Sequence, residues 1–241
     1  MLRRIKKISS SHENTYPLSI PTIASMDEIQ FKSPVTFFVG DNGSGKSTLL
    51  EAIAHQCGFN VAGGSRSNSY ELHASESSLA AHIRLSWMPK LTNGFFLRAE
   101  SFYQFSSHID ELERECPTGY SGYGGKSLHA QSHGESFLSL FLNRFDGEGI
   151  YLLDEPEAAL SPARQLAFLR IMHDIVSAEE SQLIIATHSP ILLGFPGATI
   201  LNFDEGSIAE TTYEETDHYQ ITKYFLENRE RYLHEIFKEE D

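Results

Sequence analysis

The sequence GDNGSGKST at residues 40–48 decides the fold of this chain. It matches the pattern G-x-x-x-x-G-K-[ST], with glycine at positions 40 and 45, lysine at 46 and serine at 47. The apolar run PVTFFV precedes it, and the run KSTLLEAIAHQC, with apolar residues at helical spacing, begins inside it. A strand, a glycine-rich loop and a helix in this order predict a phosphate-binding loop, because loop N–H groups and a helix N-terminus attract anions.

Each residue type in this loop suits the phosphate chain of a nucleotide. The glycines allow the backbone to approach the phosphates without an intervening side chain. Lys46 would reach the β- and γ-phosphates and support catalysis, and the hydroxyl of Ser47 would bind Mg²⁺. We therefore predict that the chain binds ATP and Mg²⁺, with nine nucleotide-binding residues: Gly40, Asp41, Asn42, Gly43, Ser44, Gly45, Lys46, Ser47 and Thr48.

Two further apolar runs end in polar residues that suit the chemistry of a nucleotide. The run IYLLDE ends in Asp154 and Glu155, and the run LIIATH ends in His188. Ligands of open α/β sheets bind at the carboxyl ends of the strands, so these side chains are expected at one edge of the sheet. We predict that Asp154 holds Mg²⁺ and that Glu155 is the general base for the attacking water. His188 would bond to the γ-phosphate or position that water.

Strands alternate with helices along the chain, which predicts an α/β fold with a largely parallel core sheet. The first 40 residues instead contain strand-like runs, including YPLSIPTI, and predict an antiparallel β part. GFFLRAESFYQF is expected to be a strand that runs into a turn. Further expectations are loops at 59–80 and 116–127, helices at 135–146 and 161–178, strands near 198–203 and 207–212, and a charged helical tail.

Composition and charge limit the classes of protein to which the chain can belong. With 241 residues, 40% of them hydrophobic and 22% charged, it is long enough for an α/β domain with a substantial core. The formal net charge of −14 disfavours non-specific binding of nucleic acid, although the basic stretch LRRIKK stays a candidate contact. Two cysteines without metal-type spacing, and no apolar stretch near ~18 residues, predict a cytoplasmic protein without membrane insertion.

These motifs resemble those of the ABC superfamily of P-loop ATPases. GDNGSGKST resembles a Walker A motif, and YLLDEP resembles a Walker B motif with its trailing glutamate. EAALSP lies at the D-loop position, His188 at the switch-histidine position, and QSHGES where these ATPases carry an LSGGQ-like signature. The runs FFLRAESF, QSHGE and DEPEAALSP are similar to small stand-alone ATPases of this superfamily, which are related to RecF-like and SMC-like ATPases.

The resemblance implies a single ABC-type ATPase domain over residues 1–241. Its core lobe would comprise residues 1–75 and 149–241, and residues 76–148 would form a helical subdomain with the signature. Leu160 and Ser161 would belong to the D-loop. Two roles stay open: Glu100 or Gln104 would fill the lobe-linking position, and Tyr16 or Phe31 would stack on adenine.

The signature region has both a functional and a structural interpretation. In the ABC arrangement, the signature of one subunit closes over the nucleotide of the other, which implies an ATP-dependent homodimer. The residues that would act in trans are Ser132, His133, Gly134 and Glu135, with His133 at a position that is usually glycine. The alternative is a helix cap, because Ser132 or Ser136 precedes or opens an apolar helix.

We therefore predict an ATPase, which converts ATP and water to ADP and phosphate and acts as a nucleotide-gated homodimer. Two alternatives stay open: an ATP-gated module that binds nucleic acid, as in DNA repair, and the ATPase subunit of a membrane transporter. The RecF-like run DEPEAALSP favours the first two of these three functions. The absence of sustained heptads between Lys46 and Ser132 excludes the coiled-coil arms of SMC-like proteins. A further protein partner and the biological process stay undetermined.

Overall fold

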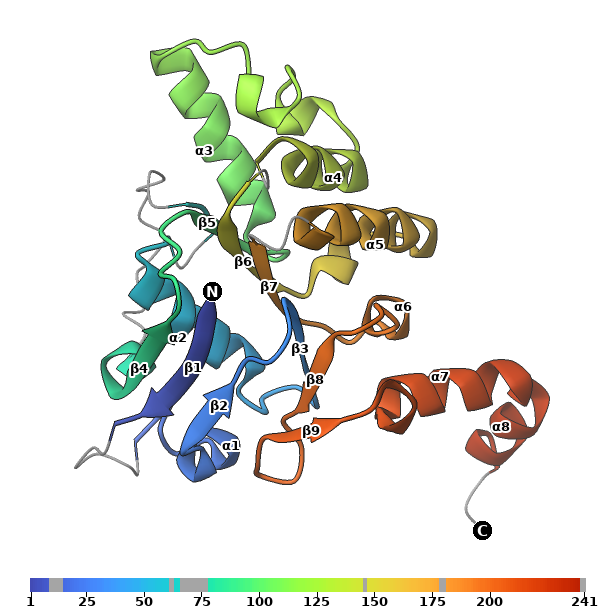
Figure 1. The fold of residues 1–241 in the computed structure, drawn as a ribbon. Helices are drawn as coiled ribbons and strands as arrows, with labels where there is room; N and C mark the ends of the chain where they lie inside the picture. The colour runs from blue at the N-terminus through green and yellow to red at the C-terminus, as the bar shows by residue number, and fades with distance from the viewer. Residues whose placement is uncertain (9–14, 61–62, 66–77, 145–146, 178–180, 239–241) are drawn as a thin grey trace.

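The computed structural model describes residues 1–8, 15–60, 63–65, 78–144, 147–177 and 181–238. Its strands form a three-stranded sheet in the order β2-β1-β4 and a six-stranded sheet in the order β5-β6-β7-β3-β8-β9 (Figure 1). The predicted site residues at strand ends all belong to strands of the larger sheet. Part of the loop expected at 59–80, residues 66–77, lies outside the described residues.

The predicted parallel core sheet is confirmed. Its strands are β3 (Val35–Val39), β5 (Gly94–Arg98), β6 (Gly149–Asp154), β7 (Ser181–Ala186), β8 (Thr199–Asn202) and β9 (Ala209–Thr211). Neighbouring strands from β5 to β8 are parallel, and β9 pairs antiparallel with β8. Every residue of β3, β6 and β7 is buried, which explains why these strands read as continuous apolar runs rather than as alternating ones.

The two faces of this sheet support two hydrophobic cores. Phe38, Leu152 and Ile184 point into one core, together with α2 (Lys46–Cys57) and the smaller sheet. Their neighbours in the sequence, such as Phe37 and Leu153, point into the other core. This core is covered by α3 (Phe102–Glu115), α4 (His133–Arg144), α5 (Pro162–Ser177) and α6 (Pro190–Leu193). Because successive side chains of a strand alternate between faces, both cores are filled from the same few residues. The P-loop therefore joins a strand and a helix that are both fixed by burial.

The smaller sheet differs in part from the expectation. β1 (Leu2–Lys7) pairs antiparallel with β2 (Glu28–Gln30) and with β4 (Ile83–Trp87), so the antiparallel part exists. The stretch YPLSIPTI was expected to be strand-like and is instead a turn that leads into α1 (Pro21–Ser25). Pro17 and Pro21 explain the difference, because proline cannot donate to a strand ladder and is favoured in the first turn of a helix.

The helical part begins later in the chain than expected. β4 and β5 belong to the two sheets although they lie within 76–148, so the helices begin with α3 (Phe102–Glu115). It is followed by the short turns η2 (Ser121–Tyr123) and η3 (Leu128–Ala130) and by α4 (His133–Arg144). Figure 1 shows α3 and α4 together at one end of the molecule, with α5 (Pro162–Ser177) beside them. The helix α3 was not expected, since FFLRAESFYQF reads as strand and turn.

A helical hairpin forms the C-terminal part of the described chain. It begins at the turn η5 (Tyr213–Glu215) and comprises α7 (Asp217–Glu227) and α8 (Arg229–Ile236). Neither helix contains a buried residue, and Figure 1 shows the hairpin projecting from the body. Among the residues described, no helix combines the length and apolarity needed to cross a lipid bilayer.

Candidate nucleotide site

The P-loop lies between β3 and α2 and is shaped by its glycines. Gly40, Gly43 and Gly45 have φ angles of 133°, 80° and 102°, a region that other residues rarely adopt. A Cβ atom at Gly45 would lie 3.1 Å from the hydroxyl of Thr22 in α1, so glycine also allows α1 to pack under the loop. The same hydroxyl donates to the carbonyl of Ser44. The loop conformation is thus fixed by packing before any ligand binds.

Lys46 is held inside the turn of the loop. Its ammonium donates to the carbonyl oxygens of Gly40 at 2.7 Å and Asp41 at 2.8 Å. Burial lowers the pKa of Lys46, and the carboxylates of Glu155 and Asp204 oppose that shift. Asp204, after β8, also accepts a bond from the backbone N–H of Asp41 at 2.8 Å. The loop therefore places a cation where it can meet a phosphate oxygen.

The two predicted magnesium ligands face each other. The hydroxyl of Ser47 donates to Asp154 Oδ1 at 2.9 Å, although 106 residues lie between them in the sequence. A hydroxyl and a carboxylate are oxygen donors of the kind that Mg²⁺ prefers, so these residues fit the metal. Asp154 is 6% exposed, and burial raises its pKa to about 6, with Arg98 acting in the opposite direction.

Arg98, at the end of β5, was not predicted from the sequence. Its Nε atom lies 3.5 Å from Asp154 Oδ2, and its other nitrogens pair with Glu51 at 2.6 Å and Glu100 at 2.5 Å. Among the described residues, no contact joins Asp154 to either candidate for the lobe-linking position: Glu100 pairs with Arg98, and Gln104 is exposed on α3. In this region, Arg98 is the residue whose side chain contacts Asp154, the predicted magnesium ligand.

The raised pKa of Asp154 predicts how stability depends on pH. Because the pKa of Asp154 is higher in the native chain than in the unfolded chain, binding of this proton stabilises the native state. The stabilisation is complete below about pH 4 and is lost as the pH rises through about 6. Asp154→Asn removes the buried charge but keeps the size. We expect it to raise the free energy of unfolding by about 1–3 kcal/mol at pH 8 without Mg²⁺ and nucleotide, and by much less at pH 4.

Urea denaturation of both proteins at pH 4 and pH 8 measures this difference. Asp174→Asn is the matched control, because Arg170 lowers the pKa of this exposed carboxyl. That substitution should not stabilise the protein at pH 8. A protein with Asp154→Asn that is less stable than the wild type at pH 8 would contradict the assigned cost of the buried charge.

Glu155 and His188 meet at the mouth of the P-loop. Glu155 has φ 50° and ψ 51°, the left-handed conformation, which is uncommon for a residue other than glycine. This turn directs its side chain into a cleft of about 170 Å³ that is lined by Tyr16, Ile20, Asn42, Gly43, Gly45, Lys46, Ser47 and Thr48. His188 Nε2 lies 3.7 Å from Glu155 Oε1. An uncommon backbone conformation at such a position is typical of functional sites.

His188 is held by two residues that the sequence did not single out. Its backbone N–H donates to Glu157 Oε1 at 2.6 Å, and burial raises the pKa of Glu157. Its Nδ1 lies 2.8 Å from Nε2 of His218 in α7. Glu157 gave a weak signal, as a second carboxylate after the apolar strand. His218 gave none, because it lies in the charged tail.

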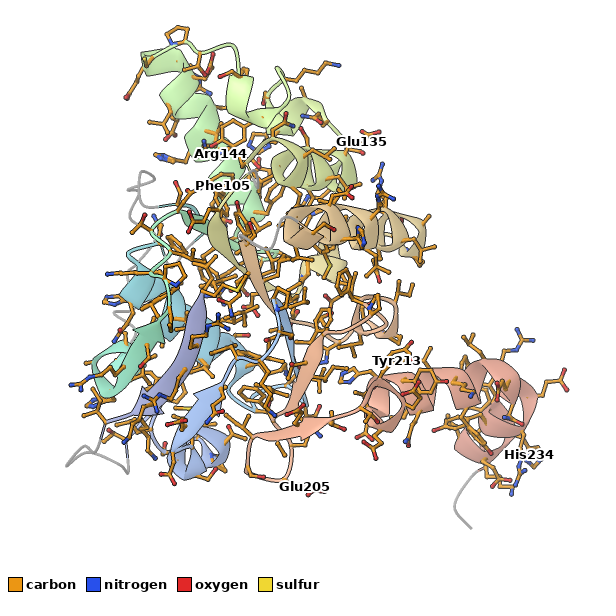
Figure 2. All side chains as sticks on the ribbon, in the orientation of Figure 1. Phe105, Glu135, Arg144, Glu205, Tyr213 and His234 are labelled. Atoms are coloured by element: carbon orange, nitrogen blue, oxygen red, sulfur yellow. The ribbon has the colours of Figure 1, made fainter. Side chains whose placement is uncertain are left out.

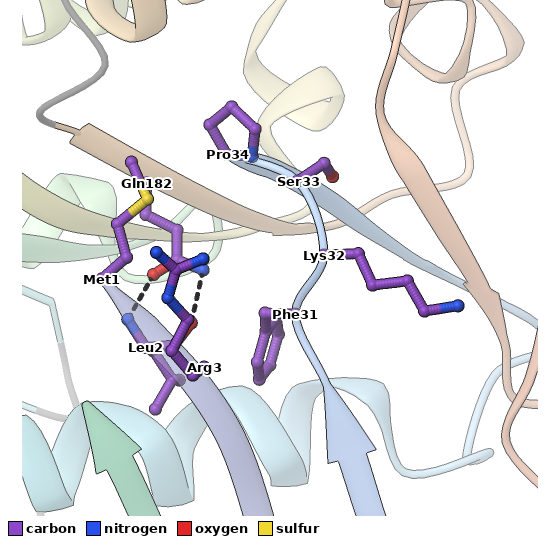
Figure 3. Close-up of a pocket in the computed structure, with 8 residues that line it drawn as sticks. All are labelled: Met1, Leu2, Arg3, Phe31, Lys32, Ser33, Pro34 and Gln182. Carbon is purple, nitrogen blue, oxygen red and sulfur yellow. Dashed lines mark hydrogen bonds between the residues drawn. The ribbon is translucent and has the colours of Figure 1, made fainter. Parts of the chain in front are cut away.

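The structure separates the two candidates for adenine stacking. Tyr16 is 76% exposed and lines the cleft of the P-loop. Phe31 is 4% exposed, belongs to a hydrophobic core and lines a different cleft, near Arg3 and Pro34 (Figure 3). In that cleft, Gln182 accepts a bond from the N–H of Leu2 at 2.8 Å and donates to its carbonyl at 3.1 Å, which joins the two sheets. Tyr16 therefore stays the candidate.

The signature residues open α4, which begins at His133 rather than at 135. The N–H and hydroxyl of Ser132 donate to Glu135 Oε2 at 3.0 and 2.6 Å, a bond that lowers the pKa of Glu135. The ring of His133 packs edge-on against Phe102, with centroids 5.5 Å apart. Ser132 is therefore engaged with the first turn of this helix through Glu135, but its hydroxyl donates to a carboxylate rather than accepting a backbone N–H as a cap does. Ser132 is also exposed.

Arg164, in the first turn of α5, adds a positive charge to the signature. Its Nη2 lies 3.3 Å from the hydroxyl of Ser132 and 3.6 Å from Glu135 Oε1. A Cβ atom at Gly134 would lie 2.3 Å from its Nη1, so glycine allows Arg164 to cross the start of α4. The sequence gave no signal for this contact, which joins residues from different helices.

The D-loop residues are connected to the segment that carries His188. Leu160 is buried, and its carbonyl accepts a bond from Gln165 Nε2 at 3.0 Å. The other end of the Gln165 amide accepts a bond from the hydroxyl of Ser189 at 2.6 Å. Ser161 is exposed and precedes α5. Gln165 therefore joins the D-loop to the residue after His188.

Two family models match parts of the chain. The first, described as "AAA domain", matches residues 23–94, and the second, described as "AAA domain, putative AbiEii toxin, Type IV TA system", matches residues 135–194. Among curated proteins, the chain is 26% identical over 226 residues to the thiamine import ATP-binding protein ThiQ of Mesorhizobium japonicum. This similarity covers 86% of the chain and 83% of that protein.

Solved structures of ABC ATPases share the fold. CbiO1 of Clostridium perfringens, part of the ABC transporter complex CbiONQ, matches with a TM-score of 0.53 and 18% identity over 97% of this chain and 98% of that chain. A metal-chelate type ABC transporter in an inward-facing conformation matches with a TM-score of 0.51 and 13% identity over 92% and 87% of the two chains. The chain is therefore similar to AAA-type domains in two segments and to an import ATP-binding protein over most of its length, and it shares the fold of ABC ATPases.

Proposed function

We propose that the chain is an ATPase that binds ATP with Mg²⁺ at the P-loop and hydrolyses its γ-phosphate. The observation that supports this most directly is the convergence of Ser47, Asp154, Glu155 and His188 around the loop that holds Lys46. These residues come from three separate segments of the chain. A phosphate-binding loop without catalysis would not need Glu155 and His188 beside it.

Each residue has a distinct role in the proposed reaction. Lys46 and the N-terminus of α2 neutralise the phosphate oxygens, and Ser47 and Asp154 would hold Mg²⁺, which neutralises charge on the β- and γ-phosphates when it is bound. Glu155 accepts a proton from the attacking water, so that the oxygen can bond to the γ-phosphorus while the bond from that phosphorus to the β–γ bridging oxygen breaks and ADP leaves. His188 lies beside Glu155 and can donate a hydrogen bond toward the γ-phosphate. Tyr16 is proposed to cover the adenine ring.

A homodimer closed by ATP is the proposed active form. Figure 1 shows α4 in the helical part, whereas the P-loop lies beside α1 at the other end of the view. The signature of one copy therefore suits the nucleotide of a second copy better than its own. Ser132, His133, Gly134 and Glu135 would contribute the helix N-terminus, and Arg164 would contribute a positive charge toward the γ-phosphate.

The similarity to ThiQ, a thiamine import ATP-binding protein, favours a second candidate, the ATPase subunit of a transporter whose permease is a separate chain. Co-purification with a membrane protein would support it. A third candidate function is binding of nucleic acid. Stimulation of the ATPase activity by DNA would support it. The cytoplasm stays the expected compartment, because two cysteines, Cys57 and Cys116, are too few for a disulfide-built secreted protein of this length.

Release of phosphate from ATP tests the proposed function. We expect slow Mg²⁺-dependent hydrolysis by the wild type and a decrease of at least about 100-fold in Lys46→Ala, because the loop then lacks the cation for the phosphates. Lys90→Ala, which changes an exposed lysine outside the site, is the matched control and should keep the wild-type rate. Equal rates for wild type and Lys46→Ala would refute the proposal.

A further inference from the structure

A second histidine lies directly behind the predicted switch histidine. His218, in the first turn of α7, places its Nε2 2.8 Å from Nδ1 of His188, with ring centroids 5.0 Å apart. The two side chains line a cleft of about 570 Å³ beside Gly40 and Asp41 of the P-loop. At 2.8 Å one nitrogen must donate a proton and the other must accept it. The direction of this bond decides which nitrogen of His188 carries its proton.

His218 has one ring proton to place. Burial and the nearby His188 and Lys46 lower the pKa of His218, so it is neutral and carries one ring proton. Its Nδ1 is buried and has no hydrogen-bond partner among the described residues. Either direction of the bond to His188 leaves one buried N–H group without a partner, at Nδ1 of His218 or at Nε2 of His188. The surroundings of His188 therefore decide the direction.

The carboxylate of Glu155 decides the direction. Nε2 of His188 is also buried without a hydrogen-bond partner among the described residues and lies 3.7 Å from that carboxylate. If His188 carried its proton on Nδ1, a bare Nε2 lone pair would face the carboxylate, which is repulsive. If His218 donates to Nδ1, the proton of His188 lies on Nε2 and faces the negative charge. The position of Glu155 thus selects the tautomer with Nε2–H.

The backbone holds the two histidines in this arrangement. The hydroxyl of Thr216 caps α7 by accepting a bond from the N–H of Tyr219, and Thr216 is itself buried. The hydroxyl of Tyr213, in the turn before α7, donates to the carbonyl of Pro190 at 2.8 Å. Pro190 lies two residues after His188. Two contacts, His218 with His188 and Tyr213 with Pro190, therefore attach the start of the hairpin to the segment of the switch histidine. Figure 2 shows Tyr213 at the base of the hairpin, where it joins the body.

We propose that His218 is a positioning residue, which fixes His188 in the Nε2–H tautomer and thereby makes it a hydrogen-bond donor toward the γ-phosphate. His188 then presents an N–H group rather than a lone pair to the site, so Glu155 accepts the proton of the water. The hairpin α7–α8 becomes part of the site, because a displacement of α7 would release the ring of His188. The kinetic part of this inference rests on the proposed ATPase activity, whereas the tautomer does not.

The tautomer is measured by long-range ¹H–¹⁵N NMR of the imidazole rings in the full chain without nucleotide. We expect the ¹⁵N shift of an unprotonated nitrogen at Nδ1 of His188 and that of a protonated nitrogen at Nε2. His218→Leu replaces the hydrogen-bond donor with an apolar side chain. In this variant, the Nδ1 resonance of His188 should move toward the average of the two tautomers. Wild-type spectra with the proton on Nδ1 of His188 would overturn the proposal, whatever the enzyme activity.

Kinetics test the consequence for hydrolysis. We expect His218→Leu to lower kcat about tenfold, within the range of a misplaced hydrogen-bond donor, with little change in the affinity for ATP. His218→Gln keeps an N–H group at a similar reach and should restore most of kcat. His234→Leu, on α8, is the matched control and should behave as the wild type, since His234 is exposed and away from the site (Figure 2).

A double substitution separates positioning from a general loss of structure. If His218 acts through His188, adding His218→Leu to His188→Ala should lower kcat no further, whereas independent effects should multiply. A wild-type kcat in His218→Leu, or multiplied effects in the double variant, would overturn the proposal. If the wild type shows no hydrolysis above Lys46→Ala, the proposed function fails, and the NMR result still decides the tautomer.

Discussion

Glu155→Gln is expected to lower kcat by about 10²- to 10⁴-fold while the affinity for ATP stays within a few-fold of the wild type. Glutamine has nearly the same shape as glutamate, but its neutral amide cannot accept a proton from water. The left-handed backbone at residue 155 depends on position and shape rather than on charge. The protein should therefore bind nucleotide and stop before bond cleavage.

Single-turnover hydrolysis and equilibrium binding of ATP, measured on the same preparation, distinguish these two effects. Glu205→Gln is the matched control, because Glu205 also adopts a left-handed conformation, with φ 58°, and is exposed away from the cleft (Figure 2). It should hydrolyse ATP at the wild-type rate. If Glu155→Gln retains that rate as well, the assignment of Glu155 as the general base is wrong.

Two inactive variants are expected to regain activity when they are mixed. Ser132→Arg adds bulk and charge beside Arg164, which already lies 3.3 Å from the Ser132 hydroxyl, so it should block closure over a partner's nucleotide. Lys46→Ala disables the P-loop and leaves the signature unchanged. A mixed dimer contains one composite site with both an intact Lys46 and an intact Ser132. If the sites act independently, equal amounts should restore about a quarter of the wild-type rate.

The experiment measures phosphate release at several mixing ratios and the mass of the complexes with ATP and with ADP. Both variants must show the wild-type far-UV circular dichroism, and Ser132→Ala separates the loss of the cap from the added arginine. We expect dimers with ATP and monomers with ADP. If folded variants restore no hydrolysis at any ratio, Ser132 does not act in trans and serves only to cap α4.

The sequence predicted the parts of the site that depend on local order. The P-loop, Asp154, Glu155 and His188 each follow directly after a buried strand, and the parallel strands β3, β6 and β7 bring these ends together. A motif next to a buried strand can therefore be placed before the structure is known. The same reasoning could not choose between Glu100 and Gln104, because the contact with Asp154 comes from neither of them.

The residues that the sequence missed depend on contacts between distant segments. Arg98 reaches Asp154 across neighbouring strands, Arg164 reaches Ser132 across two helices, and His218 reaches His188 from the C-terminal hairpin. A charged residue in a polar stretch has no pattern that distinguishes it from a solvated one. The secondary structure failed for a similar reason at YPLSIPTI, where alternation suggested a strand but two prolines favoured a turn and a helix.

At Glu155, the left-handed backbone lowers stability, whereas the proposed turnover needs the glutamate side chain. A glycine would adopt φ 50° without steric cost, and it would relieve strain of about 1 kcal/mol. A search for more thermostable variants that ignored activity would therefore favour the loss of this side chain. A chain that keeps glutamate here retains a conformational penalty at the position where the proposed reaction needs a carboxylate. Substitutions that raise the thermal stability of this protein should accordingly be sought elsewhere, in loops away from the proposed nucleotide site.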